Sequence, residues 1–199
     1  MKTAPYLISA KARRRVWSWP GLKATLALWV AAVFLCQFPG VAQTAGEYEI
    51  KAAFLFNFAK FVEWPVAASD DSSSPVVIGI VGPDPFGEVL PNTVADETVK
   101  GRRLKVRHYQ PADDLAGCQV LFVSRDQTAG LNELLKRASA RHILTVSESE
   151  DFLRQGGMIN FVQVGKNVRF DICKGAVEEA GLKMSSKLLA VAHAVKGVP

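Results

Sequence analysis

The chain has 199 residues, of which 49% are hydrophobic and 22% charged, and its 24 Lys and Arg against 19 Asp and Glu give a formal net charge of +5. This length corresponds to one domain, and the composition excludes disorder over most of the chain. The first 45 residues hold six basic residues and no acidic one, so the remainder, with 18 bases and 19 acids, is nearly neutral. A near-neutral body excludes a nucleic-acid-binding protein that works by neutralising phosphates.

The first 45 residues have the order of a secretory signal peptide. Arg13–Arg15 and Lys23 precede an uncharged apolar run from Leu26 to Cys36, and the small residues Ala42 and Ala45 offer cleavage points after it. The alternative is a membrane anchor, but a spanning helix needs about 20 apolar residues and this run is shorter. We therefore expect a cleaved signal peptide over residues 1–45, an exported protein and no stable membrane anchor.

The first strong segment of the remaining chain is an amphipathic helix predicted over residues 47–64. Apolar residues recur at intervals of three and four, polar residues such as Lys51 fall between them, and Pro65 cannot continue the helix. The aromatic residues form a stripe wider than one core face needs. We expect some of them to contact a partner or a second copy of the chain, the alternative being that all lie in the core; they are Phe56, Phe58, Phe61 and Trp64.

The rest of the chain alternates between strands and helices. Buried strands are predicted over 75–81, 118–123 and 142–146, a half-exposed strand over 102–109, and helices over 86–94 (interrupted near Pro91), 127–139 and 150–155. Along the half-exposed strand, Arg103, Lys105 and Arg107 share one face, as on a solvated edge strand. Strands over 158–164 and 168–172 flank a Gly-Lys-Asn turn and predict a hairpin, and a last helix is predicted over 182–195.

This order of elements predicts an α/β fold. Alternating strands and helices favour a three-layer arrangement with a mixed, mostly parallel sheet flanked by helices. The C-terminal antiparallel hairpin is expected at one edge of the sheet. No composition shift divides residues 46–199, so we expect them to form a single domain.

The reactive residues do not form a recognisable catalytic or metal-binding pattern. His108, His142 and His193 have no second histidine or carboxylate at metal-ligand spacing. We therefore expect a non-enzymatic binding or regulatory protein without a metal or cofactor. Two alternatives stay open: a receptor that binds a small ligand at the carboxyl edge of the sheet, and a hydrolase around Ser124 and His142.

The two cysteines beyond the signal peptide allow two interpretations. Cys118 begins a buried strand and Cys173 ends the hairpin, so a disulfide would tie the hairpin to the central sheet, as an oxidising compartment favours. The alternative is two buried thiols that react slowly. In neither case do we expect a catalytic nucleophile, because no histidine lies near either cysteine in sequence.

Three stretches of the chain are distinctive as a set. They are KAAFLFNFAKFVEWP over residues 51–65, GGMINF over 156–161 followed by VRFDI over 168–172, and GLKMSSKLL over 181–189. Together they resemble the YfiR family of exported bacterial proteins, and the resemblance runs from about Glu47 to Ala192. At one position the chain departs from the family pattern, since Cys173 stands where the family often has Asn.

The resemblance implies a function as well as a fold. It implies a periplasmic α/β domain without catalytic activity that binds and represses the periplasmic sensor domain of an inner-membrane diguanylate cyclase. In the family, relief of that repression by redox or envelope stress raises cyclic di-GMP and favours biofilm formation.

Overall fold

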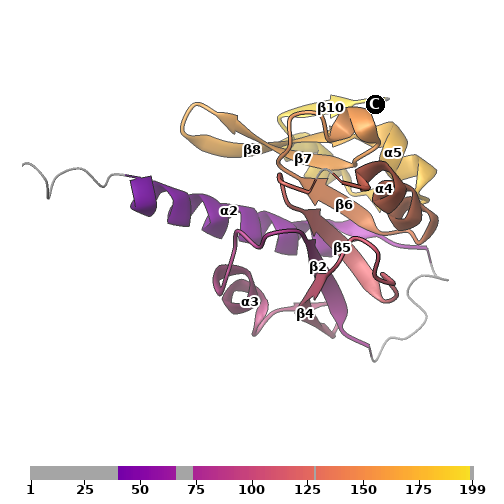
Figure 1. Ribbon diagram of the computed structural model, residues 1–199, viewed down its shortest axis with the longest axis horizontal. Coiled ribbons are helices and arrows are strands. Elements are labelled where there is room, and N and C mark those ends of the chain that lie inside the picture. The colour runs from indigo at the N-terminus through magenta and orange to yellow at the C-terminus, as the bar shows by residue number, and fades with distance from the viewer. Residues whose placement is uncertain (1–39, 66–73, 128, 198–199) are drawn as a thin grey trace, which may run out of the picture. The chain divides into compact units, whose positions relative to one another are not determined.

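The computed structural model describes residues 40–65, 74–127 and 129–197 (Figure 1). The chain divides into two compact units, Met1–Val41 and Ala42–Pro199, and all strands described here lie in the second. The predicted signal peptide lies almost entirely outside the described residues. Among the helices that are described, none is both long and apolar enough to cross a membrane.

An eight-stranded sheet forms the centre of the second unit, with the strand order β10-β8-β7-β6-β5-β2-β4-β3. Neighbouring strands pair in parallel except β7 with β8 and β3 with β4, which are antiparallel. The predicted mixed, mostly parallel sheet is therefore confirmed. The strands are β2 (Val76–Val81), β3 (Thr98–Val99), β4 (Arg102–Tyr109), β5 (Cys118–Val123), β6 (Leu144–Ser147), β7 (Ile159–Val164), β8 (Asn167–Cys173) and β10 (Ala194–Lys196).

Helices flank this sheet, which confirms the α/β class (Figure 1). The long helix α2 packs its aromatic residues against β7 and β8, while α4 follows β5 and packs against β6. The helices are α2 (Gly40–Phe61), α3 (Val89–Val94), α4 (Leu131–Ala140), α5 (Lys174–Glu179) and α6 (Ser186–Val191), with a 3-10 turn η2 (Leu153–Gln155).

The central strands are buried along their whole length. Every residue of β2, β5 and β6 is buried, as expected for parallel strands covered on both faces. The apolar, largely β-branched run of β2 made that strand predictable, whereas β5 and β6 also bury the polar residues Gln119, Thr145 and Ser147. The largest fully buried side chains of the core include Phe58, Phe122, Phe152 and Phe170.

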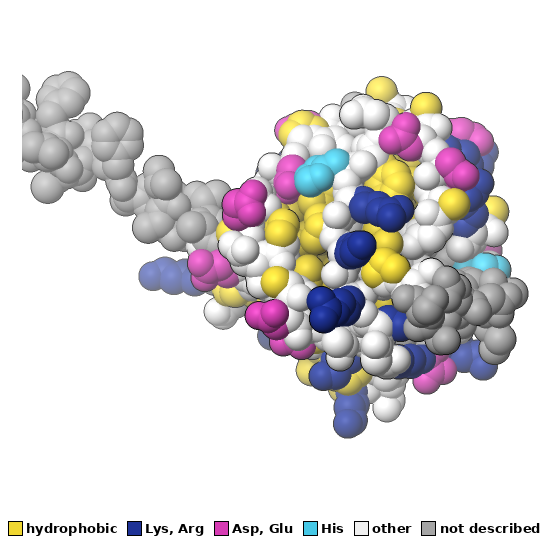
Figure 2. Space-filling model, turned by 90° about the horizontal axis from the view of Figure 1, so that it is seen from below, with side chains coloured by type: hydrophobic (Ala, Val, Ile, Leu, Met, Phe, Trp, Pro, Cys, Tyr) yellow, Lys and Arg dark blue, Asp and Glu magenta, His cyan; other side chains and the backbone are white. Residues whose placement is uncertain are grey.

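Strand β4 has the predicted half-exposed character. Arg103, Lys105 and Arg107 are exposed, whereas Leu104 between them is buried. Basic side chains gather on the face of the molecule seen in Figure 2, next to exposed hydrophobic atoms. Among the described residues, β3 pairs with only the first two residues of β4 on this edge, and the charges of β4 oppose pairing with another strand.

The hairpin of β7 and β8 closes through a two-residue turn. Val164 pairs with Asn167, so Gly165 and Lys166 form the turn and Asn167 belongs to β8. Gly165 has a φ of +61°, which glycine adopts without steric cost. The hairpin lies near one edge of the sheet, where β10 pairs outside it with β8.

Helices α2 and α3 differ in detail from the prediction. Helix α2 ends at Phe61, because the next two residues form β1 (Val62–Glu63) and pair antiparallel with β9 (Lys183–Met184) in a separate two-stranded sheet. Pro91 does not interrupt α3. It lies in the first turn of that helix, where its missing N–H would have no partner within the helix.

The predicted last helix over residues 182–195 is wrong. The chain there forms β9, then α6, then β10. Ser185 caps α6, since its hydroxyl accepts a hydrogen bond from the Leu188 N–H at 3.2 Å. The segments on either side of α6 gain backbone hydrogen bonds from β1 and β8. Strand pairing with distant segments therefore overrides a helical periodicity that looked continuous.

Candidate functional site

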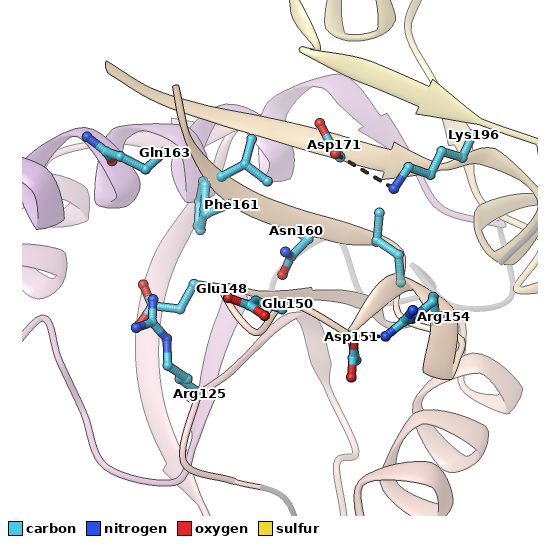
Figure 3. Close-up of a pocket in the computed structure, with 12 residues that line it drawn as sticks. Arg125, Glu148, Glu150, Asp151, Arg154, Asn160, Phe161, Gln163, Asp171 and Lys196 are labelled. Carbon is cyan, nitrogen blue, oxygen red and sulfur yellow. Dashed lines mark hydrogen bonds and ion pairs between the residues drawn. The ribbon is translucent and has the colours of Figure 1, made fainter. Parts of the chain in front are cut away.

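The carboxyl edge of the parallel strands is the candidate site. Arg125 follows the end of β5 and Glu148 follows the end of β6. Strand β7 pairs with β6 only through its first two residues, Ile159 and Asn160, and continues beyond the end of β6. A cavity of about 630 Å³ opens at this edge (Figure 3). Crevices at the carboxyl ends of strands are the usual ligand sites of open α/β sheets.

A buried ion pair links this edge to helix α2. The ammonium group of Lys51 contacts the carboxylates of Glu148 and Glu47. The side chains of Lys51 and Glu148 are only 3% and 7% exposed, whereas that of Glu47 is 33% exposed. Tyr48 donates a hydrogen bond to Glu148 Oε1 at 3.1 Å. The pair thus fixes the rotation of α2 against the sheet.

The aromatic ring of Tyr48 completes this cluster. Lys51 Nζ lies 4.5 Å from the centre of the Tyr48 ring, within range of a cation–π contact. Burial, and next the negative charge of Glu148, raise the pKa of Tyr48 to about 12. The phenol therefore stays protonated and continues to donate to Glu148 throughout the physiological pH range.

The predicted partner-binding residues fall into two groups. Phe58 is completely buried, and its ring lies 5.0 Å from that of Phe170 and 5.9 Å from that of Phe161, so in this fold it is a core residue. Phe56, Phe61 and Trp64 pack against the core but are half-exposed. These three remain candidates for contact with a partner.

The alternative of a hydrolase is wrong, because the fold separates its two residues. Ser124 follows the carboxyl end of β5, whereas His142 precedes the amino end of β6. Since Val120 pairs with Leu144, six residues of strand separate them, or about 20 Å. His142 Nδ1 instead donates to the Ala180 carbonyl at 2.7 Å.

The other two histidines make surface contacts with carboxylates. His108 lies 2.8 Å from Asp84, and His193 lies 2.8 Å from Asp171. Within the described ranges, the structure holds no group of three or more His, Cys, Asp or Glu side chains that suits a metal ion.

Cys118 and Cys173 are both buried and both free. They lie on β5 and β8, which β6 and β7 separate in the sheet. Three strand spacings amount to about 14 Å, whereas a disulfide needs Cα atoms within about 7 Å. A bond between them would require the sheet to open, so this fold holds the two buried thiols rather than the bridge.

We expect both thiols to react slowly in the folded protein. Burial raises the pKa of Cys118 to about 12, so its thiol stays neutral at pH 9, where about half or more of an exposed cysteine is thiolate. Labelling with a thiol reagent at pH 9 should therefore be far slower in buffer than in urea. Fast labelling of either cysteine in the native protein, before any reductant is added, would contradict the buried-thiol assignment.

Sequence reasoning missed the residues that build the carboxyl edge. Lys51 looked like part of the polar face of its helix, yet it is among the most buried charged residues described. Its spacing of four from Glu47 was a usable signal for an ion pair. Glu148 directly follows a buried strand, so the rule for open sheets would have placed it at this edge. Asn160 gave no comparable signal, because it lies within a strand.

Comparison with known proteins identifies the family of the chain. A family model described as YfiR/HmsC-like matches residues 48–193. No curated protein matches the chain. Among solved structures, a conserved domain protein from Vibrio cholerae O1 biovar El Tor str. N16961 is 17% identical, with a TM-score of 0.45. That match covers 60% of this chain, and this chain spans 54% of the length of the Vibrio chain.

Proposed function

Because the chain belongs to the YfiR/HmsC-like family, we propose that it is a periplasmic, non-enzymatic regulatory protein. In this proposal it binds the periplasmic sensor domain of an inner-membrane diguanylate cyclase, represses it and so lowers cyclic di-GMP. The family match over residues 48–193 is the observation that carries the proposal, because it covers almost all of the described chain.

The half-exposed end of α2, together with the residues just after it, is the surface that we assign to the partner. Phe56, Phe61 and Trp64 present aromatic rings there, and Lys60 Nζ lies 5.8 and 5.9 Å from the ring centres of Phe56 and Phe61. Aromatic residues dominate binding energy at interface centres, because they bury much area at little cost in entropy. A second copy of the chain is the alternative occupant of this surface.

The partner surface predicts a separation of binding from stability. We expect Phe61→Ala and Trp64→Ala each to weaken binding about tenfold or more, which is the scale of an interface hot spot. The control is Val191→Ala, which removes another exposed apolar side chain at a distance in the sequence. Binding is measured against the purified periplasmic domain of each membrane-bound diguanylate cyclase of the same genome.

The same variants have an expected effect in cells. Deletion of the gene should raise the level of cyclic di-GMP. Expression of the wild-type chain or of Val191→Ala should return it to the lower wild-type level, whereas expression of Phe61→Ala or Trp64→Ala should leave it raised. Far-UV circular dichroism checks that each variant is folded, and sedimentation measures self-association. If both aromatic variants return cyclic di-GMP to the wild-type level, this surface is not the partner-binding surface. If deletion leaves the level of cyclic di-GMP unchanged, the protein does not have the regulatory role.

Export is part of the proposal. We expect the periplasmic form of the protein to begin between about Val41 and Glu47, because a basic stretch and an apolar run precede small residues there. N-terminal sequencing of protein released from the periplasm measures this directly. Recovery of the full-length chain from the membrane fraction would instead support the anchor.

A further inference from the structure

The cavity at the carboxyl edge has the size and setting of a small-molecule site. Its volume of about 630 Å³ lies within the range of about 300–1,000 Å³ that such sites occupy. One wall is the part of β7 that extends past the end of β6, together with Asp171 of β8. The other wall is the turn around η2, which contributes Asp151, Leu153 and Arg154.

A buried amide lies in the wall of this cavity. Asn160 is only 6% exposed, and its Oδ1 atom has no hydrogen-bond partner within the described part of the chain. A buried polar atom without a partner is unfavourable. Rotation of the amide exchanges its oxygen and its NH₂ group, so the side chain can present a donor or an acceptor to a ligand. Figure 3 shows the Asn160 amide and Glu150 directed toward the same space.

Most of the charged residues that line the cavity are already paired. The carboxylate of Glu148 contacts Lys51, that of Asp151 contacts Arg154, and that of Asp171 contacts His193 and, at 3.9 Å, Lys196. Two lining residues have no ion pair among the described residues, namely Arg125 and Glu150. The cavity therefore offers one unpaired cation, one unpaired anion and one buried amide.

This set of groups selects a class of ligand. Four carboxylates line the cavity, so a polyanion such as a nucleotide would meet repulsion, and three cations disfavour a polyamine. A zwitterion satisfies both unpaired charges. Within this volume it can be longer than one amino acid, and the amide group of Asn160 has the same hydrogen-bonding groups as a peptide bond.

We propose that the cavity binds a short peptide of about three residues with free termini. Arg125 pairs with the terminal carboxylate, for which its planar guanidinium provides two parallel donors. Glu150 pairs with the terminal ammonium group, and the Asn160 amide bonds to the peptide backbone between them. The site is separate from the aromatic surface assigned to the cyclase, so this proposal goes beyond the proposed function and does not depend on it.

Trialanine is the probe that tests recognition of the termini and backbone alone. Isothermal titration of the mature protein with trialanine should show saturable binding. N-acetyl-trialanine and trialanine amide should each bind at least about tenfold more weakly, because each lacks one terminal charge. Inorganic phosphate should not compete. Absence of saturable trialanine binding, or equal binding of the capped peptides, would overturn the proposal.

Variants assign each terminus to a residue. Arg125→Gln should abolish the preference for trialanine over its amide, and Glu150→Gln should abolish the preference over the acetylated form. Both side chains are exposed, so these variants should fold normally. Arg103→Gln and Glu97→Gln are the matched controls, since they remove the same exposed charges elsewhere. Asn160→Leu should reduce binding to all three peptides. Unchanged preferences in both Arg125→Gln and Glu150→Gln would refute the assignment of the two termini.

Discussion

Replacement of Lys51 by methionine is expected to destabilise the fold by about 3–5 kcal/mol, one of the two largest effects anticipated for a single substitution. The reason is the carboxylate of Glu148, whose side chain is 7% exposed and which would lose the ammonium group that compensates its charge. Tyr48 would still donate one hydrogen bond to Glu148, but a neutral donor does not replace a cation. Urea denaturation of wild type and variant measures the difference.

A double replacement distinguishes the loss of the whole ion pair from the loss of one of its charges. Lys51→Met with Glu148→Met removes both charges and should recover most of the stability that Lys51→Met loses, because an apolar pair of similar volume replaces a buried ion pair with little net cost. Lys60→Met is the control on the same helix, and the exposed position of Lys60 predicts a change within about 0.5 kcal/mol. A loss below about 1 kcal/mol for Lys51→Met would show that Glu148 is hydrated in solution.

Replacement of Phe58 by alanine should cost a similar amount, about 3–5 kcal/mol. Phe58 has no exposed surface, and its ring contacts those of Phe54, Phe161 and Phe170 with centroid distances of 6.1, 5.9 and 5.0 Å. Alanine would leave a cavity between α2 and the hairpin of β7 and β8 in addition to the lost transfer free energy. Equilibrium denaturation gives the change in the free energy of unfolding.

Phe56→Ala is the matched control for this prediction. It removes the same side chain two residues away, from a half-exposed position, and should cost clearly less than Phe58→Ala. Phe58→Leu keeps much of the volume and should fall between the two. If Phe56→Ala and Phe58→Ala destabilise equally, the assignment of Phe58 to the core and Phe56 to the surface is incorrect.

The sequence predicted the centre of the fold better than its ends. Strand β2 is a continuous apolar run and β5 is apolar except for Gln119, and burial on both faces is their simplest explanation. The chain beyond Gly181 was assigned to one helix, although it contains two short strands. Those strands exist because β1 and β8 offer hydrogen-bonding partners, and no local pattern reveals a partner that lies up to 122 residues away, as Met184 does from Val62.

The sequence predicted where the candidate site lies but not which residues come together there. The rule that ligands bind at the carboxyl edge of an open sheet gives the edge, but not the register that brings Asn160 beside Asp171. The aromatic stripe of α2 was visible in sequence. Which of its residues are buried, as Phe58 is, and which are half-exposed, as Phe56 and Trp64 are, depends on where the hairpin packs. Lys51 was missed because a lysine is rarely buried unless a partner is present, and its partner Glu148 is 97 residues away.

The aromatic contacts of α2 have a consequence for how the chain folds as it is synthesised. Phe54 and Phe58 emerge early, but the rings that they contact, Phe161 and Phe170, belong to a hairpin more than 100 residues later. The apolar side of the helix therefore lacks these partners until about four fifths of the 199 residues have emerged. Long-range contacts of this kind slow folding and expose aggregation-prone surface. The protein should thus depend on chaperones more strongly at high expression than its size alone suggests.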